Sequence, residues 1–255
     1  MSRDRGGPDD DDLVAGRRPV LELLRAGGSV ERVLLSQDLR TAPILRDIRS
    51  AAEEASVPVR VVPKDEVERI ARGLNHQGVV ARTARYRYTP FDELLSRPAP
   101  ALLFLDGITD PHNLGSLLRS ADGAGFDGVV LPARRSSGVT ASVRRVSAGA
   151  AEVVPVARVT NLARALDQGK EAGLWIVGLD ERGPTDLWSS DLVEPPVGVL
   201  LGAEDRGISR VAKDRCDELV RISLRGRLSS LNVAVAGALA MFEVARRRGD
   251  QSSSL

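Results

Sequence analysis

Six short, continuously apolar runs in the second part of this 255-residue chain constrain its fold more than any other feature. Each run leads into a helical or loop segment, and the runs are Leu102–Leu105, Gly128–Leu131, Val153–Val156, Leu174–Val177, Val197–Leu201 and Leu219–Ile222. An unbroken apolar run is typical of a strand buried on both faces, and strands separated by helices form parallel sheets. We therefore predict an α/β domain over residues 101–248, with a mostly parallel sheet and a final helix from about Ser229 to Arg247.

The first part of the chain is predicted to form a smaller, separate α/β domain over residues 13–88. Its periodic segments indicate helices at Pro19–Arg25, Ala42–Ala55 and Lys64–Arg72, and strands at Glu31–Ser36, Val57–Val62 and Gln77–Arg87. Residues 89–100 contain three prolines and are interpreted as a linker. The polar ends, residues 1–12 and 249–255, are expected to be disordered tails, the first of them acidic.

Composition excludes several classes of protein. Cys216 is the only cysteine, so an intrachain disulfide is impossible, and the two histidines, His76 and His112, are far apart, so we expect no metal site. Aromatic residues make up 3% of the chain, which argues against a stacking platform for single-stranded bases. No apolar run approaches the roughly 20 residues that span a membrane, and the chain has no signal segment, so we expect a cytoplasmic protein. Neither a Gly-x-Gly-x-x-Gly loop after a strand nor a Walker lysine loop is present, which argues against dinucleotide-binding, open-sheet methyltransferase and P-loop proteins.

The charge balance leaves two interpretations open. The formal net charge is +1, but residues 1–12 carry five aspartates and two arginines, so the remainder has 34 basic and 30 acidic residues, a net charge of +4. Arginine accounts for 33 of the 36 basic residues. Arginine is suited to bidentate contacts with phosphate, and a GC-rich genome produces the same bias.

Three polar segments follow predicted strands, where ligands of open parallel sheets bind. The first is the helix that begins near Asp110-Pro111, in which Asn113 and Arg119 are interpreted either as a cap and a solvent-exposed charge or as an active-site pair. The second is the loop Gly202–Ser209, whose glycines let backbone approach a ligand closely, and a similar loop occurs at Gly178–Gly183. The third opens the last helix with serines and Asn232.

Taken together and in order, these segments resemble the three motifs of the SpoU (TrmH-like) branch of the SPOUT RNA methyltransferases. The residues that carry the resemblance are Asn113-Leu114-Gly115-Ser116 with Arg119, Gly202-Ala203-Glu204 with Gly207, and Ser230-Leu231-Asn232-Val233. The first domain, with Val14-Ala15-Gly16 and His76-Gln77-Gly78-Val79-Val80-Ala81, resembles the ribosomal-protein-L30e-like RNA substrate-binding domain of this family. The resemblance covers nearly everything but the tails.

The resemblance implies an RNA ribose 2′-O-methyltransferase that uses S-adenosylmethionine, contains a deep trefoil knot and works as a homodimer in which each site is completed by the partner subunit. Threaded segments corresponding to residues 178–183, 202–207 and 222–231 would wrap the cofactor. The residues expected to bind the cofactor are Gly202, Ile222, Leu231, Leu201, Gly207 and Leu179. The residues expected to act in catalysis are Arg119, Asn113, Glu204, Ser230 and Asn232.

Arg119 matches the position of the family's proposed base, but a guanidinium keeps its proton at neutral pH and is a poor base. We therefore interpret Arg119 as a group that positions a phosphate and stabilises the developing alkoxide, with Asn113, Glu204, Ser230 and Asn232 orienting the ribose and Arg119 itself. His112 lies one residue before the motif position, and we interpret it as a supporting or RNA-facing residue.

The closeness of the match favours the subgroup that methylates a guanosine of 23S ribosomal RNA (RlmB-like). Two departures concern the pocket: Asp205-Arg206 stands where relatives tend to carry Gly-Glu, and Ser223 where a proline often follows the isoleucine. The alternatives are a 2′-O-methyltransferase of transfer RNA or one that confers antibiotic resistance on ribosomal RNA. A protein of another class, a non-catalytic RNA-binding protein with the same fold, is the third alternative. In every case we expect structural RNA as the partner, and neither membrane nor metal.

Overall fold

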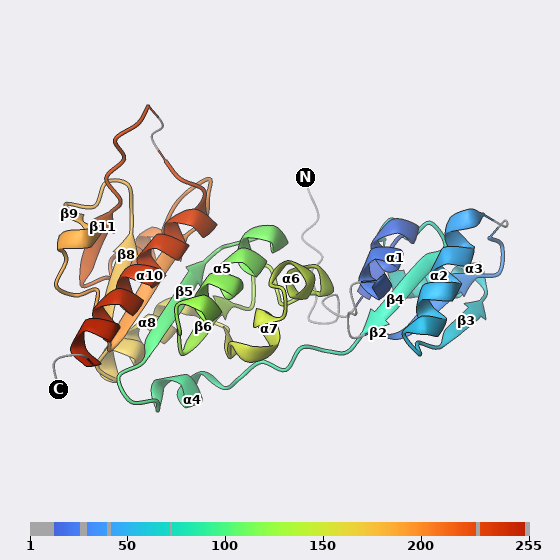
Figure 1. The fold of residues 1–255 in the computed structure, drawn as a ribbon, viewed down its shortest axis with the longest axis horizontal. Helices are drawn as coiled ribbons and strands as arrows, with labels where there is room; N and C mark the ends of the chain where they lie inside the picture. Colours follow the sequence, from blue (N-terminus) through green and yellow to red (C-terminus); the bar gives the residue numbers. More distant parts are fainter. Residues whose placement is uncertain (1–12, 26–29, 40–41, 72, 228–229, 253–255) are drawn as a thin grey trace. The chain divides into compact units, whose positions relative to one another are not determined.

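The computed structural model describes residues 13–25, 30–39, 42–71, 73–227 and 230–252. The chain divides into two compact units, one formed by the residues up to Arg87 together with Val139–Arg145, the other by Tyr88–Gly138 and the residues from Val146 onward. Both units alternate strands and helices along the chain (Figure 1). The expected disordered tail at residues 1–12 lies outside the described residues, as do residues 253–255. No helix in the described ranges is both long and apolar enough to cross a membrane.

The N-terminal unit is built on a four-stranded sheet with helices on both faces. The strands, in spatial order, are β1 (Leu13–Ala15), β4 (Val79–Thr83), β2 (Val30–Ser36) and β3 (Val59–Val62), and only the β2–β3 pair is parallel. The helices are α1 (Arg17–Arg25), α2 (Pro43–Glu54) and α3 (Lys64–Ala71). Side chains of a strand alternate between faces, and in β4 they serve two cores: Val79 and Ala81 pack under α1 and α2, whereas Val80 packs under α3.

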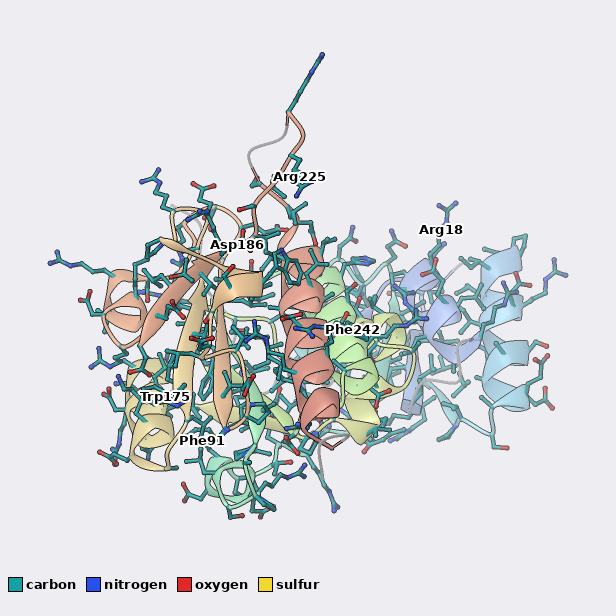
Figure 2. The ribbon with its side chains drawn as sticks, turned by 60° about the vertical axis from the view of Figure 1, so that its left-hand side comes forward. Arg18, Phe91, Trp175, Asp186, Arg225 and Phe242 are labelled. Atoms are coloured by element: carbon teal, nitrogen blue, oxygen red, sulfur yellow. The ribbon has the colours of Figure 1, made fainter. Side chains whose placement is uncertain are left out.

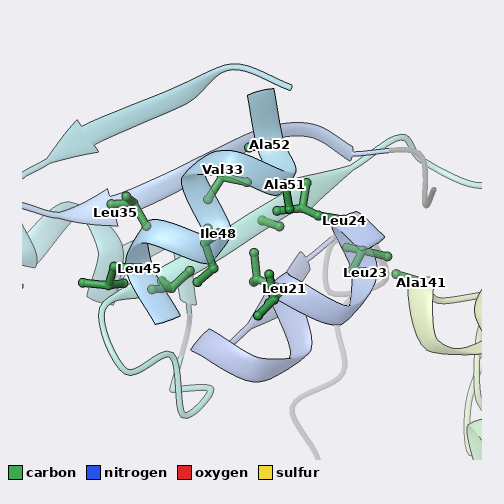
Figure 3. Close-up of a cluster of buried hydrophobic side chains, with 13 residues drawn as sticks. Leu21, Leu23, Leu24, Val33, Leu35, Leu45, Ile48, Ala51, Ala52 and Ala141 are labelled. Atoms are coloured by element: carbon green, nitrogen blue, oxygen red, sulfur yellow. The ribbon is translucent and has the colours of Figure 1, made fainter. Parts of the chain in front are cut away.

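The larger of these two cores is shown in Figure 3, where Leu21 and Leu24 of α1 meet Ile48 of α2 above the sheet. Ala141, from α6 (Ala141–Val146), packs in the same cluster, although it lies far along the chain from the rest of the unit. The N-terminal unit is thus completed by a short segment that interrupts the sequence of the second unit.

The C-terminal unit contains a seven-stranded sheet in which every neighbouring pair of strands is parallel. In spatial order the strands are β7 (Val156–Val159), β6 (Gly128–Pro132), β5 (Ala101–Asp106), β10 (Val197–Gly202), β8 (Trp175–Leu179), β11 (Glu218–Arg221) and β9 (Thr185–Asp186). Residues 101–105 are completely buried, as an apolar run between two layers of helices must be. The predicted α/β fold with a mostly parallel sheet is confirmed.

Helices cover both faces of this sheet. One face carries α5 (Pro111–Gly123) and α10 (Val233–Ser252), which lie side by side in Figure 1. The other carries α4 (Phe91–Leu95), α8 (Leu162–Glu171) and α9 (Arg210–Lys213), whose apolar side chains pack with Phe104 and Leu200 of the central strands. The remaining short helices are α7 (Ala150–Val153) and the 3-10 helix at Leu187–Ser189.

Four features differ from the sequence-based expectations. The strand predicted at Val153–Val156 is wrong: α7 ends at Val153, which is 70% exposed, and β7 begins at Val156 after a proline that has no amide to donate. Residues 89–100, expected as a linker, contain α4, because Leu94 is fully buried against the sheet. The final helix begins at Val233 instead of about residue 229, and it continues to Ser252, through part of the segment expected as a disordered tail.

Candidate active site

The loop that leaves β10 is closed on itself by two backbone hydrogen bonds. The Ala203 amide donates to the Gly207 carbonyl (3.1 Å) and the Gly207 amide donates to the Ala203 carbonyl (2.8 Å), so residues 204–206 form its tip. Gly207 has φ of +65°, a conformation that favours glycine. A Cβ on Gly202 would lie 2.0 Å from the carbonyl carbon of Gly207, so only glycine fits where the loop folds back. The sequence Gly202-Ala203-Glu204-Asp205-Arg206-Gly207 thus holds Glu204 at the carboxyl end of a central strand.

Three side chains from distant segments meet at this loop. Glu204 Oε1 accepts hydrogen bonds from Asn113 Nδ2 (2.9 Å) and Asn232 Nδ2 (2.9 Å), and Asn232 Nδ2 also donates to Asn113 Oδ1 (3.1 Å). Asn232 Oδ1 in turn accepts from the amide of Ala234 (2.9 Å) in the first turn of α10. We call Asn113, Glu204 and Asn232 the polar triangle. Since each carboxamide has its oxygen and nitrogen assigned by these partners, the orientation of both amides is fixed.

Asn113 lies in the first turn of α5, and it is not the N-cap residue of this helix. The capping residue is Asp110, whose side chain accepts from the His112 amide (3.0 Å), and Pro111 occupies the first turn, where its missing N–H costs nothing. The interpretation of Asn113 as a cap is therefore wrong. Asn113 is only 7% exposed, and a buried carboxamide needs its hydrogen-bond partners. His112 is exposed beside it and forms no side-chain hydrogen bond with a described residue.

A pocket of about 650 Å³ opens at the triangle. Its walls come from the ends of β8, β10 and β11, from the loop at residues 202–207 and from the start of α10. All six residues expected to bind the cofactor line it: Leu179, Leu201, Gly202, Gly207, Ile222 and Leu231. Of the residues expected in catalysis, Glu204, Ser230 and Asn232 line it, and Asn113 reaches it through Glu204.

Arg119 is the expected site residue that the structure does not bring to the pocket. It is exposed on α5 and has no hydrogen bond or ion pair with any residue in the described ranges. It lies six residues after Asn113, which places its backbone about 9 Å further along the helix. Arg119 therefore lies outside the pocket of its own chain.

The pocket also contains charged side chains that were not singled out from the sequence. Asp180 forms an ion pair with Lys213, and Asp180 is 11% exposed. Burial raises the pKa of Asp180, but the Lys213 hydrogen bond, the Arg182 amide and both positive charges outweigh it, so the pKa lies below its usual value. The signal that could have found Asp180 is its place in the loop Gly178–Gly183, which repeats the pattern of the loop after β10.

The balance of charge around the pocket is close to neutral. Four carboxylates and three cations line it, and these are Asp180, Glu181, Glu204, Asp205, Arg182, Arg206 and Lys213. The remainder of the wall is largely aliphatic. In the part of the chain that the structure describes, no group of three histidine, cysteine or acidic side chains is arranged to hold a metal ion.

Two sequence models of known protein families match this chain. The sequence model of the SpoU rRNA methylase family matches residues 100–242, more than half of the chain. The chain belongs to the SpoU rRNA methylase family. A second model, for the substrate-binding domain of RNA 2′-O ribose methyltransferases, matches residues 13–89. The enzyme class expected from the three motifs, an RNA 2′-O-methyltransferase, is thereby confirmed.

Relatives and solved structures agree with this assignment. A Staphylococcus haemolyticus protein that is assigned by name to the TrmH family of tRNA/rRNA methyltransferases is 38% identical over 244 residues, covering 94% of this chain and 97% of the relative. Two solved structures, each 26% identical, are similar along most of the chain. The AdoMet-bound rRNA methyltransferase of Sinorhizobium meliloti has a TM-score of 0.61 and coverage of 93% and 87%. The SpoU methyltransferase AviRb of Streptomyces viridochromogenes, in complex with AdoMet, has a TM-score of 0.62 and coverage of 95% and 94%. The SPOUT fold of this SpoU methylase is confirmed.

Proposed function

We propose that this SpoU methylase transfers the methyl group of S-adenosylmethionine to a ribose 2′-oxygen of structural RNA, with a guanosine of 23S ribosomal RNA as the preferred target. The observation that carries the proposal is the polar triangle at the edge of the 650 Å³ pocket. Such a site places fixed hydrogen-bonding groups next to a cavity of the size that small ligands occupy.

The residues of the pocket fit S-adenosylmethionine. Leu179, Leu201, Ile222 and Leu231 supply aliphatic surface suited to the faces of an adenine ring, and backbone groups around them are available to its edges. A Cβ on Gly207 would meet no protein atom within 4 Å, so the backbone there is open to close approach by a ligand. When bound, the cofactor supplies a methyl group on a positively charged sulfur.

The charged side chains of the pocket suit a ligand that carries charges of both signs. Asp180 keeps a lowered pKa and stays ionised, so it can accept hydrogen bonds from an ammonium or a ribose hydroxyl, and Lys213 and Arg182 are near it for a carboxylate. The Asp180–Lys213 pair is formed without the ligand, so both charged groups are held in place before it binds.

The polar triangle orients the acceptor ribose. Glu204 Oε1 is occupied by two amides, whereas Oε2 has no partner among the described residues and is available to accept a hydrogen bond from a ribose hydroxyl. The Ser230 hydroxyl lies at the same pocket and is exposed. A hydroxyl held between Glu204 and Ser230 has a fixed direction, which is the main contribution that positioning makes to a transfer step.

We keep Arg119 as a group that binds an RNA phosphate and stabilises negative charge on the reacting oxygen. A guanidinium does not accept a proton at neutral pH, and Arg119 is exposed and without an ion pair to any described residue, so it is available to RNA. The two roles give different results: Arg119→Lys should keep substantial activity if the residue positions a phosphate. An Arg119→Ala enzyme whose rate recovers only as the pH rises would indicate base chemistry instead.

We propose a homodimer as the working form. Val235, Leu239 and Phe242 of α10 are 49%, 37% and 52% exposed, and their spacing places them on one face of the helix. Phe242 is labelled on α10 in Figure 2. Phe242 lies at the side of α10 that meets α5, because its ring is 3.4 Å from a Cβ built on Gly123. An apolar stripe of this kind is suited to the same stripe of a second copy, in which each site would be completed by its partner.

The test of the proposed function uses RNA from cells that lack this gene. The purified full chain and radiolabelled S-adenosylmethionine are incubated with that RNA, which is then separated into ribosomal and transfer RNA, and 2′-O-methyl marks are mapped. We expect label in 23S ribosomal RNA at a guanosine, and we propose the cytoplasm as the place of this reaction in the cell. Label in transfer RNA alone, or at another ribosomal site, would favour the first two alternatives. A chain that binds RNA but gives no calorimetric signal with S-adenosylmethionine would be a non-catalytic binder.

A further inference from the structure

A second pocket, of about 450 Å³, lies in the N-terminal unit. It is formed by the start of α1, the end of β2, the start of α3 and the loop at residues 73–78 that joins α3 to β4. This loop contains His76-Gln77-Gly78, to which the proposed methyl transfer assigns no role. We call this cavity the loop pocket. Its polar lining includes Arg17, Asp38, Lys64, Asn75 and Gln77.

The loop that forms one wall is rigidly built although its backbone is strained. Gln77 has φ of +47°, which a residue with a side chain rarely adopts, and Gly78 follows with φ of +79°. Arg17 Nε donates to the Gln77 carbonyl (3.2 Å), and the Gly78 amide donates to His76 Nδ1 (3.0 Å). The Val79 amide donates to the His76 carbonyl (2.7 Å). Strained backbone that the surroundings hold in place is a recurrent feature of binding sites.

These contacts leave many hydrogen-bonding groups available in the loop pocket. Arg17 uses one of its five N–H groups for Gln77 and has no other hydrogen-bond partner in the described part of the chain. Asn75, Gln77 and Asp38 also line the pocket. Their side chains neither donate a hydrogen bond to a described residue nor accept one from it. His76 accepts at Nδ1, so its Nε2 carries the proton and is a donor.

The charges of the loop pocket suit a phosphate at one side. Lys64 pairs with Glu68 at 3.4 Å, but both side chains are more than half exposed, and such a pair exchanges easily for a stronger partner. Arg17 and Lys64 therefore provide two cations beside the amides of Asn75 and Gln77, and the carboxylates of Asp38 and Glu68 line the rest of the charged wall. Leu39 and Leu74 provide apolar surface in the same cavity.

We propose that the loop pocket binds one unpaired nucleotide of the RNA substrate, at a site separate from the pocket that takes the cofactor. Arg17 and Lys64 would bind the phosphate, and Asn75, Gln77 and Asp38 would form hydrogen bonds with the base edge. This inference rests on the proposed function in one respect, namely that RNA is the substrate. The combination of cations, amides and apolar side chains in a concave site favours a splayed nucleotide over a duplex, whose bases do not expose their pairing edges.

Among the described residues, the lining of the loop pocket includes no phenylalanine, tyrosine or tryptophan, and the imidazole of His76 is the ring that it contains. A base bound there would contact Leu39, Leu74 and the His76 ring with its faces, and its recognition would depend on the hydrogen bonds at its edge. This separates the proposed site from the aromatic stacking platforms that the composition of the chain already argued against.

The first experiment compares two double variants of the full chain. Lys64→Ala/Asn75→Ala removes one exposed cation and one exposed amide from the loop pocket, whereas Arg60→Ala/Gln37→Ala removes the same two kinds of group from exposed positions of the same unit outside it. The substrate is unmodified 23S ribosomal RNA, or unmodified transfer RNA if that is what the wild type methylates. We expect the first variant to raise KM for RNA about tenfold with unchanged kcat, and the control to behave as the wild type. The calorimetric Kd for S-adenosylmethionine should be unchanged in both.

The second experiment identifies the contact directly. The same RNA is substituted with 4-thiouridine, crosslinked to the wild-type chain by light and digested, and the tryptic peptide that carries a nucleotide adduct is found by mass spectrometry. We expect adducts on residues 73–82, the peptide between two arginines that contains the loop. A single-stranded oligonucleotide should compete for this crosslink, and a perfect RNA duplex should not.

The outcomes separate this inference from the proposed function. If the wild type methylates RNA while the pocket variant matches its control in KM and no adduct falls on residues 73–82, the loop pocket is not a nucleotide site and the proposed function stands. If the wild type binds RNA without methylating it, the crosslink still decides the pocket while the proposed reaction fails. If the pocket variant loses kcat or cofactor binding, it has a general structural defect, and the crosslink in the wild-type chain then decides the inference: adducts on residues 73–82 support it, and their absence overturns it.

Discussion

Replacement of Glu204 by alanine is the sharpest test of the polar triangle. The change removes two hydrogen bonds, to Asn113 Nδ2 and Asn232 Nδ2, both 2.9 Å long. Asn232 is exposed, so water can replace its lost partner at little cost, but Asn113 is 7% exposed and would be left with an unpaired donor. An unsatisfied buried polar group costs about 1–3 kcal/mol, and because Glu204 itself is exposed and water can reach the gap, we expect about 1–2 kcal/mol.

The assay is urea unfolding of the full chain followed by tryptophan fluorescence. Both tryptophans, Trp175 and Trp188, lie in the C-terminal unit, so the signal reports the unit that contains the site. With an m-value of about 2 kcal/mol/M, the expected loss lowers the midpoint by about 0.5–1 M. Glu204→Gln keeps an acceptor oxygen and should lose less than about 0.5 kcal/mol.

The matched control is Asp205→Ala, the next residue along the same loop, which is exposed and has no hydrogen bond to a described residue through its side chain. We expect it to unfold within about 0.5 kcal/mol of the wild type. In methyl transfer to RNA, Glu204→Ala should be slower by about 10- to 100-fold, because both amides lose their fixed orientation. The reasoning is refuted if Glu204→Ala and Asp205→Ala share one unfolding midpoint.

Three further predictions concern other parts of the C-terminal unit. Gly202→Ala should abolish calorimetric binding of S-adenosylmethionine, since a Cβ would lie 2.0 Å from the Gly207 carbonyl carbon; wild-type affinity would contradict this. The hydrogen bond from Arg246 lowers the pKa of Glu243 despite burial, so its carboxylate stabilises the fold above the unfolded-state pKa of about 4.3 and this contribution is lost as the pH falls through the lower folded pKa. The stability difference between wild type and Glu243→Gln, measured by urea unfolding, should therefore shrink below about pH 4, and a difference that grows there would be evidence against it. Burial raises the pKa of Cys216 to about 11, so at pH 8 its alkylation by iodoacetamide should be at least about 100-fold slower in the folded chain than in urea, and equal rates would contradict this prediction.

The parallel sheet could be predicted because its strands are buried on both faces and leave continuous apolar runs in the sequence. Ala101–Asp106 and Val197–Gly202 were found almost to the residue for this reason. The prediction failed at Val153, where an exposed valine at the end of a helix precedes Pro155 and extends the apolar run by accident. Composition gives no information on which apolar residue of such a run faces solvent.

The short elements between strands were harder to predict. Prolines at both ends of residues 89–100 indicated a linker, yet Leu94 packs into the core and the segment forms one helical turn around it. At α5 the sequence does contain the signal, because Asp110 followed by Pro111 is the pattern of a cap and first turn, which places Asn113 inside the helix.

The sequence predicted which residues belong to the site, but not the contacts that they form with one another. Polar residues at the ends of predicted strands indicated the segments that form the site, and the family motifs indicated which residues in them act. The contacts between them join positions 91 and 119 residues apart in the chain, and no local pattern specifies such a pairing. The position of Arg119 outside the pocket, by contrast, follows from its spacing, because six residues of helix place its backbone about 9 Å further along α5 than Asn113.

The polar triangle also explains why the binding pocket and the acceptor-orienting groups form one unit. Asn232 caps α10 through its Oδ1 and contacts Glu204 through its Nδ2, so the position of the helix and that of the loop after β10 are set by one side chain. Gly237, five residues after Asn232, lets α10 approach Leu117 and Leu201 so closely that a Cβ there would lie 2.5 and 2.6 Å from their methyl carbons. Leu201 in turn lines the pocket. A ligand that displaces the loop therefore has to move the start of α10 as well, and the groups that orient the ribose are held in place by the same contacts that shape the cofactor pocket.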